Sequence, residues 1–265
     1  VVVFLAIEDG VGVGDYYGCL DGGLAVKSSA RISMTMAELS QQGRVSSGAL
    51  EDGLSALFVT GVTEVPRAIT DILTLRHGEL ANVVISDTTG VSAEIAPFCS
   101  LYPADINGDG VTEVPRPEPL PNWYEGDMPY QRIDWRGYDS QGNVTLVQST
   151  YHSTEDGWYL RLRDEWRDQI LVSRGLAQDE ATVTFYIAGG RGQPPEPFLR
   201  ITAITGSNRE NRAVRGGRFN LSRRQETFYA AELLEANDAW AYGVTEDQLR
   251  EAFSLIAAEW SVGEN

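Results

Sequence analysis

The sequence predicts a predominantly antiparallel β protein of the α+β class, built from two modules. Short segments rich in β-branched residues, bounded by glycine, proline and asparagine, recur along the 265 residues and are typical of strands. The heptapeptide GVTEVPR of residues 61–67 recurs unchanged at residues 110–116, and repeats of this kind usually mark stacked β units such as propeller blades. After about residue 155 the predicted strands become longer. We therefore expect propeller-blade-like β repeats over residues 1–152, followed over residues 153–265 by an α/β sandwich with an antiparallel sheet and a C-terminal helix.

The N-terminal module opens with an apolar segment, VVVFLAI at residues 1–7. It is too short for the apolar region of a signal peptide, so we interpret it as a strand and expect a leader to have been removed before it. The glycines of residues 10–14 imitate a phosphate-binding loop without its Gly-Lys-Ser/Thr ending, and we interpret them as a degenerate β turn. Further strands of this module are expected at residues 56–60, 70–76, 80–86, 132–138 and 144–151. The last two form a hairpin across a glycine-containing turn.

Four prolines lie within residues 115–122. Because proline has no N–H group for a ladder, we expect this stretch to be extended and at the surface, as a linker or a long connection. The C-terminal module is expected to contain strands at residues 157–163, 169–173, 181–187 and 197–204.

A helix is predicted at the end of the chain. Thr245 and Gln248 have the spacing of a capping box. The apolar residues that follow have helical spacing and would lie on one face of the helix, which would cover a sheet: Leu249, Phe253, Ile256 and Trp260.

Composition restricts the classes of partner. The formal charge of -17, from 38 acidic and 21 basic residues, argues against nucleic acid and anionic membrane surfaces, because the summed field repels phosphates. No apolar run of about 18 residues occurs, so no transmembrane span is expected. Cys19 and Cys99 allow one disulfide in an oxidising compartment or two free thiols, and both alternatives stay open.

Residues 105–113, DINGDGVTE, have the composition of a calcium-type loop. Hard cations such as Ca²⁺ take roughly six to eight oxygen ligands, and alternate residues of a tight loop supply them. Arg116 stands where an EF-hand has its bidentate glutamate, so the loop is not an EF-hand. Gly110 allows the sharp turn, and Val111 would contribute its carbonyl. The expected metal ligands are Asp105, Asn107, Asp109, Val111 and Glu113.

A bound Ca²⁺ ion would have a structural role, because its binding free energy would add to that of folding. The alternative is an ordinary Asn-Gly-Asp-Gly turn without metal, since these residues also form hairpin turns.

The loop pattern resembles the calcium loop of FG-GAP/VCBS-type repeats, the β-propeller blades of integrins and of many bacterial surface proteins. The segment around the first heptapeptide, with Asp71-Ile-Leu and Gly78-Glu-Leu, resembles a blade that has lost its ligands. Residues 157–260 resemble, more loosely, the PsbP-type α/β sandwich domains of bacterial lipoproteins. The whole chain is similar to secreted lipoproteins of gut Firmicutes. These resemblances imply an extracellular or cell-surface protein that holds structural Ca²⁺.

The residues identify no reaction. His77 and His152 are the two histidines, and we interpret each as an ordinary loop or strand-end residue. No Gly-x-Ser-x-Gly elbow occurs. One stretch of aromatic residues would form either a sugar-stacking platform or core and cross-strand pairs: Trp123, Tyr124, Tyr130, Trp135 and Tyr138. A basic stripe would bind an acidic glycan or partner, or balance the chain's own charge: Arg209, Arg212, Arg215, Arg218, Arg223 and Arg224.

We therefore expect an extracytoplasmic cell-envelope accessory protein that binds or scaffolds a glycan or a protein at the cell surface. The alternative is a hydrolase that acts on cell-surface polysaccharide, with the proline-rich and aromatic stretch lining its cleft. Neither expectation indicates an oligomeric state.

Overall fold

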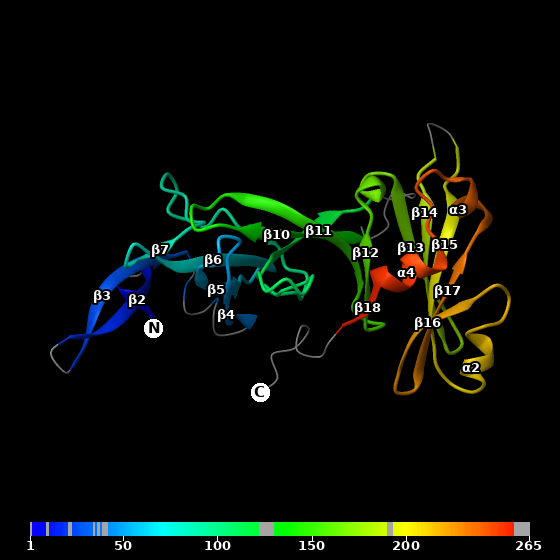
Figure 1. The fold of residues 1–265 in the computed structure, drawn as a ribbon, viewed down its shortest axis with the longest axis horizontal. Coiled ribbons are helices and arrows are strands. Elements are labelled where there is room, and N and C mark those ends of the chain that lie inside the picture. Colours follow the sequence, from blue (N-terminus) through cyan, green and yellow to red (C-terminus); the bar gives the residue numbers. More distant parts are fainter. Residues whose placement is uncertain are drawn as a thin grey trace. The chain divides into compact units, whose positions relative to one another are not determined.

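The computed structural model describes residues 2–8, 11–20, 23–33, 35, 38, 42–121, 130–189 and 193–256. These residues form four sheets, mostly antiparallel, with few and short helices (Figure 1). The prediction of a predominantly antiparallel β protein is therefore confirmed. The described residues form no closed propeller.

The chain divides into two compact units, each described here by itself. Within the described part of the chain, unit 1 takes its residues from Val1–Pro117 and Asp134–Val147, and unit 2 takes its residues from Glu118–Ile133 and Gln148–Ala258. The chain crosses between the units inside strands, at residues 117–118, 133–134 and 147–148. No single linker therefore separates the units among the described residues.

Unit 1 contains two sheets. One has the strand order β1-β2-β3, and the other has the order β4-β5-β6-β7, with β8 paired to β6. Their bounds are β1 (Val2–Glu8), β2 (Val11–Leu20), β3 (Gly23–Ile32), β4 (Arg44–Ala49), β5 (Ser55–Val62), β6 (Arg67–Arg76), β7 (Glu79–Asn82) and β8 (Ile95–Pro97).

The β4–β7 sheet is apolar on both faces. Phe58 pairs with Ile72 across β5 and β6, and both side chains belong to one core cluster. The next residues along these strands, Val59 and Leu73, belong to a second cluster. Because successive side chains of a strand point to opposite faces, a strand buried on both faces has a continuous apolar run, as β5 does.

The interpretation of residues 10–14 as a degenerate turn is wrong for the part that the structure describes, because residues 11–14 lie in β2. Gly14 pairs with Leu5 of β1. A Cβ atom at Gly14 would lie 2.9 Å from Cδ1 of Leu73. A glycine in this strand therefore allows a side chain of the neighbouring sheet to approach closely.

The other two sheets have the strand orders β18-β12-β11-β10-β9 and β13-β14-β15-β17-β16. The hairpin predicted for residues 132–138 and 144–151 is confirmed: its strands are β10 and β11 of the β18-β12-β11-β10-β9 sheet. The bounds are β9 (Val114–Pro119), β10 (Gln131–Tyr138), β11 (Val144–Ser153), β12 (Trp158–Leu162), β13 (Ile170–Ala177), β14 (Glu180–Ile187), β15 (Glu196–Ile204), β16 (Phe219–Arg224), β17 (Thr227–Leu233) and β18 (Phe253–Leu255). The helices are η1 (Asp164–Trp166), α2 (Arg209–Arg212), α3 (Glu235–Ala239) and α4 (Glu246–Ala252).

Unit 2 has one large core that takes side chains from β11 and β12 and from the β13–β17 sheet. Aromatic rings contribute much of it. Trp166 of η1 lies edge-on to Phe198 at 5.1 Å and stacks on Trp240 at 6.0 Å between ring centroids. The Trp166 indole N–H donates to the carbonyl of Tyr242 at 2.8 Å, so this buried donor is satisfied.

The capping box at the last helix is confirmed, but the length of the helix is not. The Thr245 hydroxyl accepts from the amide of Gln248, whose side chain accepts from the Thr245 amide. The helix ends at Ala252, and Phe253 begins strand β18, which pairs with β12. The expectation of one helical face that continues through Phe253 and Ile256 is wrong, because pairing with the edge of β12 supplies backbone hydrogen bonds that outweigh the helical spacing. Trp260 lies outside the described residues.

Replacing Thr245 by alanine is expected to destabilise unit 2 by about 1 kcal/mol, because the Gln248 amide at the start of α4 loses the Thr245 hydroxyl as its acceptor. Urea unfolding followed by tryptophan fluorescence measures the change. Thr154→Ala removes a threonine from an exposed turn of the same unit and is the matched control. Equal effects of the two substitutions would show that the cap contributes nothing.

Candidate metal centre

The loop of residues 105–113 is closed by a short antiparallel bridge. The amides of Ala104 and Glu113 each donate to the other residue's carbonyl at 3.0 Å. Strand β9 follows directly at Val114. Backbone hydrogen bonds alone therefore hold the two ends of the loop together.

Side-chain oxygens organise the backbone inside the loop. The Asp105 carboxylate accepts from the amides of Gly108, Asp109 and Gly110 at 2.7, 3.2 and 2.9 Å. Asn107 Oδ1 accepts from the Asp109 amide at 3.0 Å. Gly108 and Gly110 have φ values of 80° and 88°, in the left-handed region that favours glycine.

Asp109 continues the pattern, since its Oδ1 accepts from the amide of Val111 at 2.8 Å and its Oδ2 accepts from Asn107 Nδ2 at 2.8 Å. Asn107 and Asp109 are exposed, and Asp105 is half-buried. The structure therefore brings three of the predicted ligands together around one tight turn.

Glu113 differs from the other predicted ligands because it is 0% exposed. Its Oε2 accepts from the amide of Ile106 at 3.1 Å. Its Oε1 is buried and has no hydrogen-bond partner among the described residues. Burial is the main cause that raises the pKa of Glu113 to about 7; the hydrogen bond from the Ile106 amide opposes this shift, and the charges of Asp109 and Asp105 add to it.

A buried oxygen without a partner is costly, and a cation beside it would remove that cost. The donor set of this loop, carboxylates with one amide, is the set that hard cations such as Ca²⁺ prefer. The residues present fit the ion in chemistry. In the described part of the chain, however, no three side chains of His, Cys, Asp or Glu already converge as a metal cluster.

Two positions that sequence reasoning missed dock this loop on β4. The Thr112 amide donates to the carbonyl of Ala49 at 2.9 Å. A Cβ atom at Gly48 would lie 2.0 Å from the Thr112 hydroxyl, so only glycine permits this approach. No local motif surrounds Gly48, and its role depends on a contact between distant parts of the chain.

The two identical heptapeptides have different structures. In the first copy Gly61 and Val62 end strand β5, and Glu64 is exposed in the turn that follows. In the second copy Gly110 belongs to the loop and Glu113 is buried before β9. The same glutamate is thus a solvated turn residue in one copy and a buried candidate ligand in the other.

The sugar-stacking interpretation of the aromatic stretch is wrong for the residues that the structure describes. Trp135 and Tyr138 are 1% and 3% exposed, so neither can present a ring to a ligand. Tyr138 donates a short hydrogen bond to Glu94, which also contacts Arg136. Tyr130 packs against the core of unit 2. Trp123 and Tyr124 lie outside the described residues.

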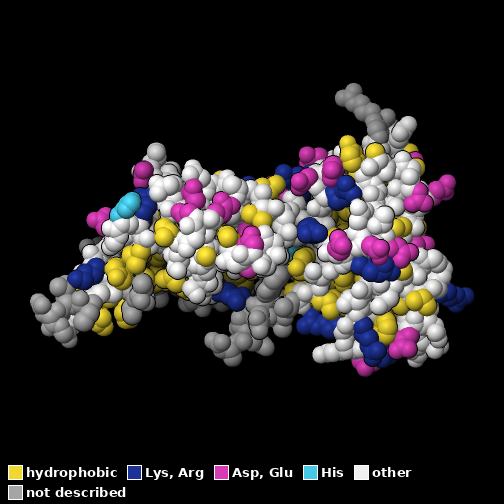
Figure 2. Space-filling model, in the orientation of Figure 1, with side chains coloured by type: hydrophobic (Ala, Val, Ile, Leu, Met, Phe, Trp, Pro, Cys, Tyr) yellow, Lys and Arg dark blue, Asp and Glu magenta, His cyan; other side chains and the backbone are white. Residues whose placement is uncertain are grey.

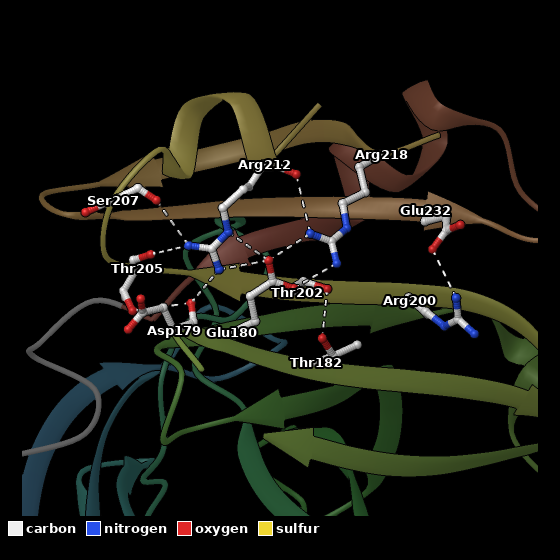
Figure 3. A network of polar contacts seen from close by, with 10 residues as sticks. All are labelled: Asp179, Glu180, Thr182, Arg200, Thr202, Thr205, Ser207, Arg212, Arg218 and Glu232. Carbon is white, nitrogen blue, oxygen red and sulfur yellow. Dashed lines mark hydrogen bonds and ion pairs between the residues drawn. The ribbon is translucent and has the colours of Figure 1, made fainter. Parts of the chain in front are cut away.

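Most of the basic stripe pairs with the chain's own acceptors. Arg212 and Arg218 both bind the carboxylate of Glu180, at 2.9 Å each (Figure 3). On the face shown in Figure 2, acidic and basic side chains lie close together over the β13–β17 region. The other partners are Glu226 for Arg209, Glu210 for Arg223 and the Ile256 carbonyl for Arg224, while Arg215 is exposed. The stripe therefore balances the chain's own charge.

Neither histidine lies in a catalytic arrangement among the described residues. His77 is an exposed turn residue with a φ of 53°. His152 lies in β11, where its ring stacks on Tyr159 with centroids 5.0 Å apart. Burial lowers the pKa of His152 to about 3.

Cys99 is a free thiol in the structure, and the side chain of Cys19 lies outside the described residues. A search of the described helices finds none with the length and hydropathy of a membrane span. Comparison of the chain with protein-family models, with curated proteins and with solved structures gives no match.

Proposed function

We propose that this chain is an extracytoplasmic cell-envelope accessory protein that binds or scaffolds a partner, and that Ca²⁺ in the loop of residues 105–113 stabilises its unit 1. The observation that supports the metal is the buried Oε1 of Glu113, which has no partner among the described residues. The loop before it supplies three further oxygen-bearing side chains in the order that suits a cation.

In this proposal Asp105, Asn107 and Asp109 give one side-chain oxygen each, Val111 gives its carbonyl, and Glu113 gives the buried oxygen. Asp105, Asn107 and Asp109 each also accept an amide hydrogen bond, which holds the turn in place, and the carboxylates, which do not yet converge among the described residues, would turn towards the ion. Ca²⁺ would supply the positive charge that a buried carboxylate otherwise lacks. The consequence is a firmer junction between the loop and strands β4 and β9.

The finer architecture is part of the same proposal. We interpret the β4–β7 sheet and the calcium-type loop as a modified pair of FG-GAP/VCBS-like blades, and unit 2 as an α/β sandwich. The location at the cell surface and the lipoprotein character rest on this resemblance. A structural Ca²⁺ site of modest affinity suits an extracellular setting, where known modules bind at about 10⁻⁴ to 10⁻³ M.

The alternative of a polysaccharide hydrolase gains no support from the aromatic stretch. That alternative required Trp135 and Tyr138 to line a cleft, and both are buried. A chromogenic glycoside panel tests it directly. Turnover that a single carboxylate substitution abolishes would replace the accessory function.

The calcium proposal predicts that millimolar Ca²⁺ raises the midpoint of thermal unfolding of the parent protein relative to excess EDTA. Ligand at about 100 times its Kd adds about 2.7 kcal/mol of stability. Glu113→Gln and Asp109→Ala are expected to lose this response. Asp87→Asn, at an exposed carboxylate elsewhere in unit 1, is the control and should respond like the parent. A parent protein that does not respond to Ca²⁺ would contradict the metal site.

A further inference from the structure

Strand β13 forms one edge of the β13-β14-β15-β17-β16 sheet (Figure 1). Its pairing with β14 ends at Ala177 and Glu180, across a two-residue turn. In such a hairpin the closing pair exchanges hydrogen bonds, so Gly175 and Ala177 bond inward and the alternate residues point their N–H and C=O groups away from the sheet. The Arg174 amide confirms this direction, because it donates to the Tyr130 hydroxyl at 2.9 Å.

The next outward position is Leu176. No backbone or side-chain group of the described residues bonds to its amide or carbonyl. Its side chain is 72% exposed, and Gly175 and Ala177 on either side are exposed too. An edge strand with free backbone groups and an exposed apolar side chain is a template for another strand.

Two other edges in this part of the chain are blunted. Strand β9 carries Pro115, Pro117 and Pro119, which have no N–H to offer. Strand β16 has its Asn220 carbonyl bound by Arg250 at 3.4 Å. Beyond the Arg174 amide, which donates to Tyr130, the end of β13 has no proline, lysine or covering hydrogen bond among the described residues, so it is an accessible edge.

An acidic cleft of about 420 Å³ borders this edge, and Arg174, Leu176 and Ala177 of β13 form one wall of it. Four carboxylates also line the cleft: Glu155, Asp156, Asp179 and Glu180. Arg174 is already bound, at 2.8 Å to Asp156 and at 2.7 Å to Glu155.

Two of these carboxylates are exposed to a further cation, although one of them already contacts Arg174. Glu180 is paired with Arg212 and Arg218 (Figure 3). Asp156 accepts two hydrogen bonds from Arg174, one from Nε and one from Nη2. Asp179 has no ion pair among the described residues, and Glu155 is 73% exposed with one contact to Arg174. The cleft beside the free edge therefore carries excess negative charge.

We propose that the outer edge of β13, residues 174–177, binds an extended basic segment of a partner protein by strand addition. The outward N–H and C=O of Leu176 pair with the backbone of the segment. The side chain of Leu176 contacts the aliphatic stem of a lysine or arginine, whose charge lies between Asp179 and Glu155. The formal charge of -17 draws such a partner to the chain.

This inference rests on the proposed binding function and is independent of the calcium loop, which lies in the other unit. A peptide result and a Ca²⁺ result can thus fail separately. If the peptide does not bind while Ca²⁺ still stabilises the protein, only the strand-addition inference is lost.

The test uses the whole chain and a labelled, acetylated peptide of alternating lysine and valine, with fluorescence anisotropy as the measurement. The comparison peptides are an alternating glutamate and valine peptide and a lysine–valine peptide N-methylated at every second residue. We expect binding of the first peptide only, weakened as ionic strength rises. Leu176→Pro removes the outward N–H without touching the ladder to β14, and should weaken binding about tenfold. Leu176→Ala keeps that N–H and should weaken it about threefold or less.

Charge is tested separately from the backbone. Glu155→Gln combined with Asp179→Asn should weaken binding about fivefold, and asparagine tolerates the left-handed backbone of position 179. Glu64→Gln combined with Asp87→Asn makes the same change of charge at exposed residues of unit 1 and should have little effect. Absence of binding by the lysine–valine peptide, or equal binding by Leu176→Pro and the parent, overturns the inference. Equal weakening by the two charge pairs does so too, because it indicates attraction to net charge alone.

Discussion

Replacing Trp166 by alanine is expected to destabilise unit 2 by about 3 to 5 kcal/mol, the range for removal of a large buried aromatic side chain. The ring is 1% exposed and contacts both Phe198 and Trp240. Its N–H also holds the carbonyl of Tyr242 at 2.8 Å, so the substitution leaves that acceptor without a buried donor. Urea unfolding followed by far-ultraviolet circular dichroism measures the loss, since this signal does not depend on the deleted indole.

Two further variants are controls for the Trp166→Ala measurement. Trp166→Phe keeps an aromatic ring but loses the N–H, and should cost less than the alanine variant. Leu176→Ala removes an apolar side chain that is 72% exposed and should change stability by less than about 0.5 kcal/mol. A loss below about 1 kcal/mol for Trp166→Ala would mean that the aromatic cluster does not hold unit 2 together.

Lowering the pH from 7 towards 4 is expected to destabilise unit 2 through His152. Burial lowers the pKa of His152 to about 3, whereas an unfolded histidine has a pKa of about 6.5. Between these values the unfolded chain binds a proton that the folded chain does not, so stability falls as pH falls through this window. The slope approaches about 1.4 kcal/mol for each pH unit, which makes this effect comparable with the loss of a core side chain.

His152→Phe isolates this contribution, because phenylalanine preserves the stacking on Tyr159 and has no proton to bind. As the pH falls below about 6.5, the unfolding free energy of the parent should decrease more than that of the variant. His77→Asn, at an exposed turn with a positive φ, should follow the parent at every pH. The measurement is urea unfolding in EDTA, so that the calcium loop does not contribute. A difference that stays constant with pH would show that His152 is solvated in the folded protein.

Local sequence signals predicted the elements that depend on neighbouring residues. Apolar patterns located β12, β13, β14 and β15 of unit 2 but not β16, β17 or β18. The turn after Tyr138 identified the hairpin of β10 and β11. The Thr245 capping box is also a local feature, and it is present at the predicted residues. These features depend on side chains a few positions apart, so the sequence alone contains the information.

Contacts between distant segments decided what the local patterns could not. Helical spacing predicted a helix through Phe253 and Ile256, but the edge of β12 offered backbone partners, and the chain became β18. For Trp135 and Tyr138 the sequence left a surface platform and core packing as alternatives, because no local rule shows which face of a hairpin another sheet will cover, and both residues are buried. The free edge of β13 is likewise a property of the strand order, which the sequence does not reveal.

The calcium-type loop shows both influences within a few residues. The sequence by itself determined which oxygens are available, the two glycines that the turn requires, and the predominance of antiparallel strands, because these follow from side-chain chemistry and local backbone preference. The identical heptapeptides show what it did not determine, since Glu64 is exposed and Glu113 is buried. Only the tertiary structure decided that difference: the bridge to Ala104 and the contact of Thr112 with Gly48 of β4 hold the second copy of the heptapeptide against distant segments, whereas Glu64 lies exposed in a turn after β5.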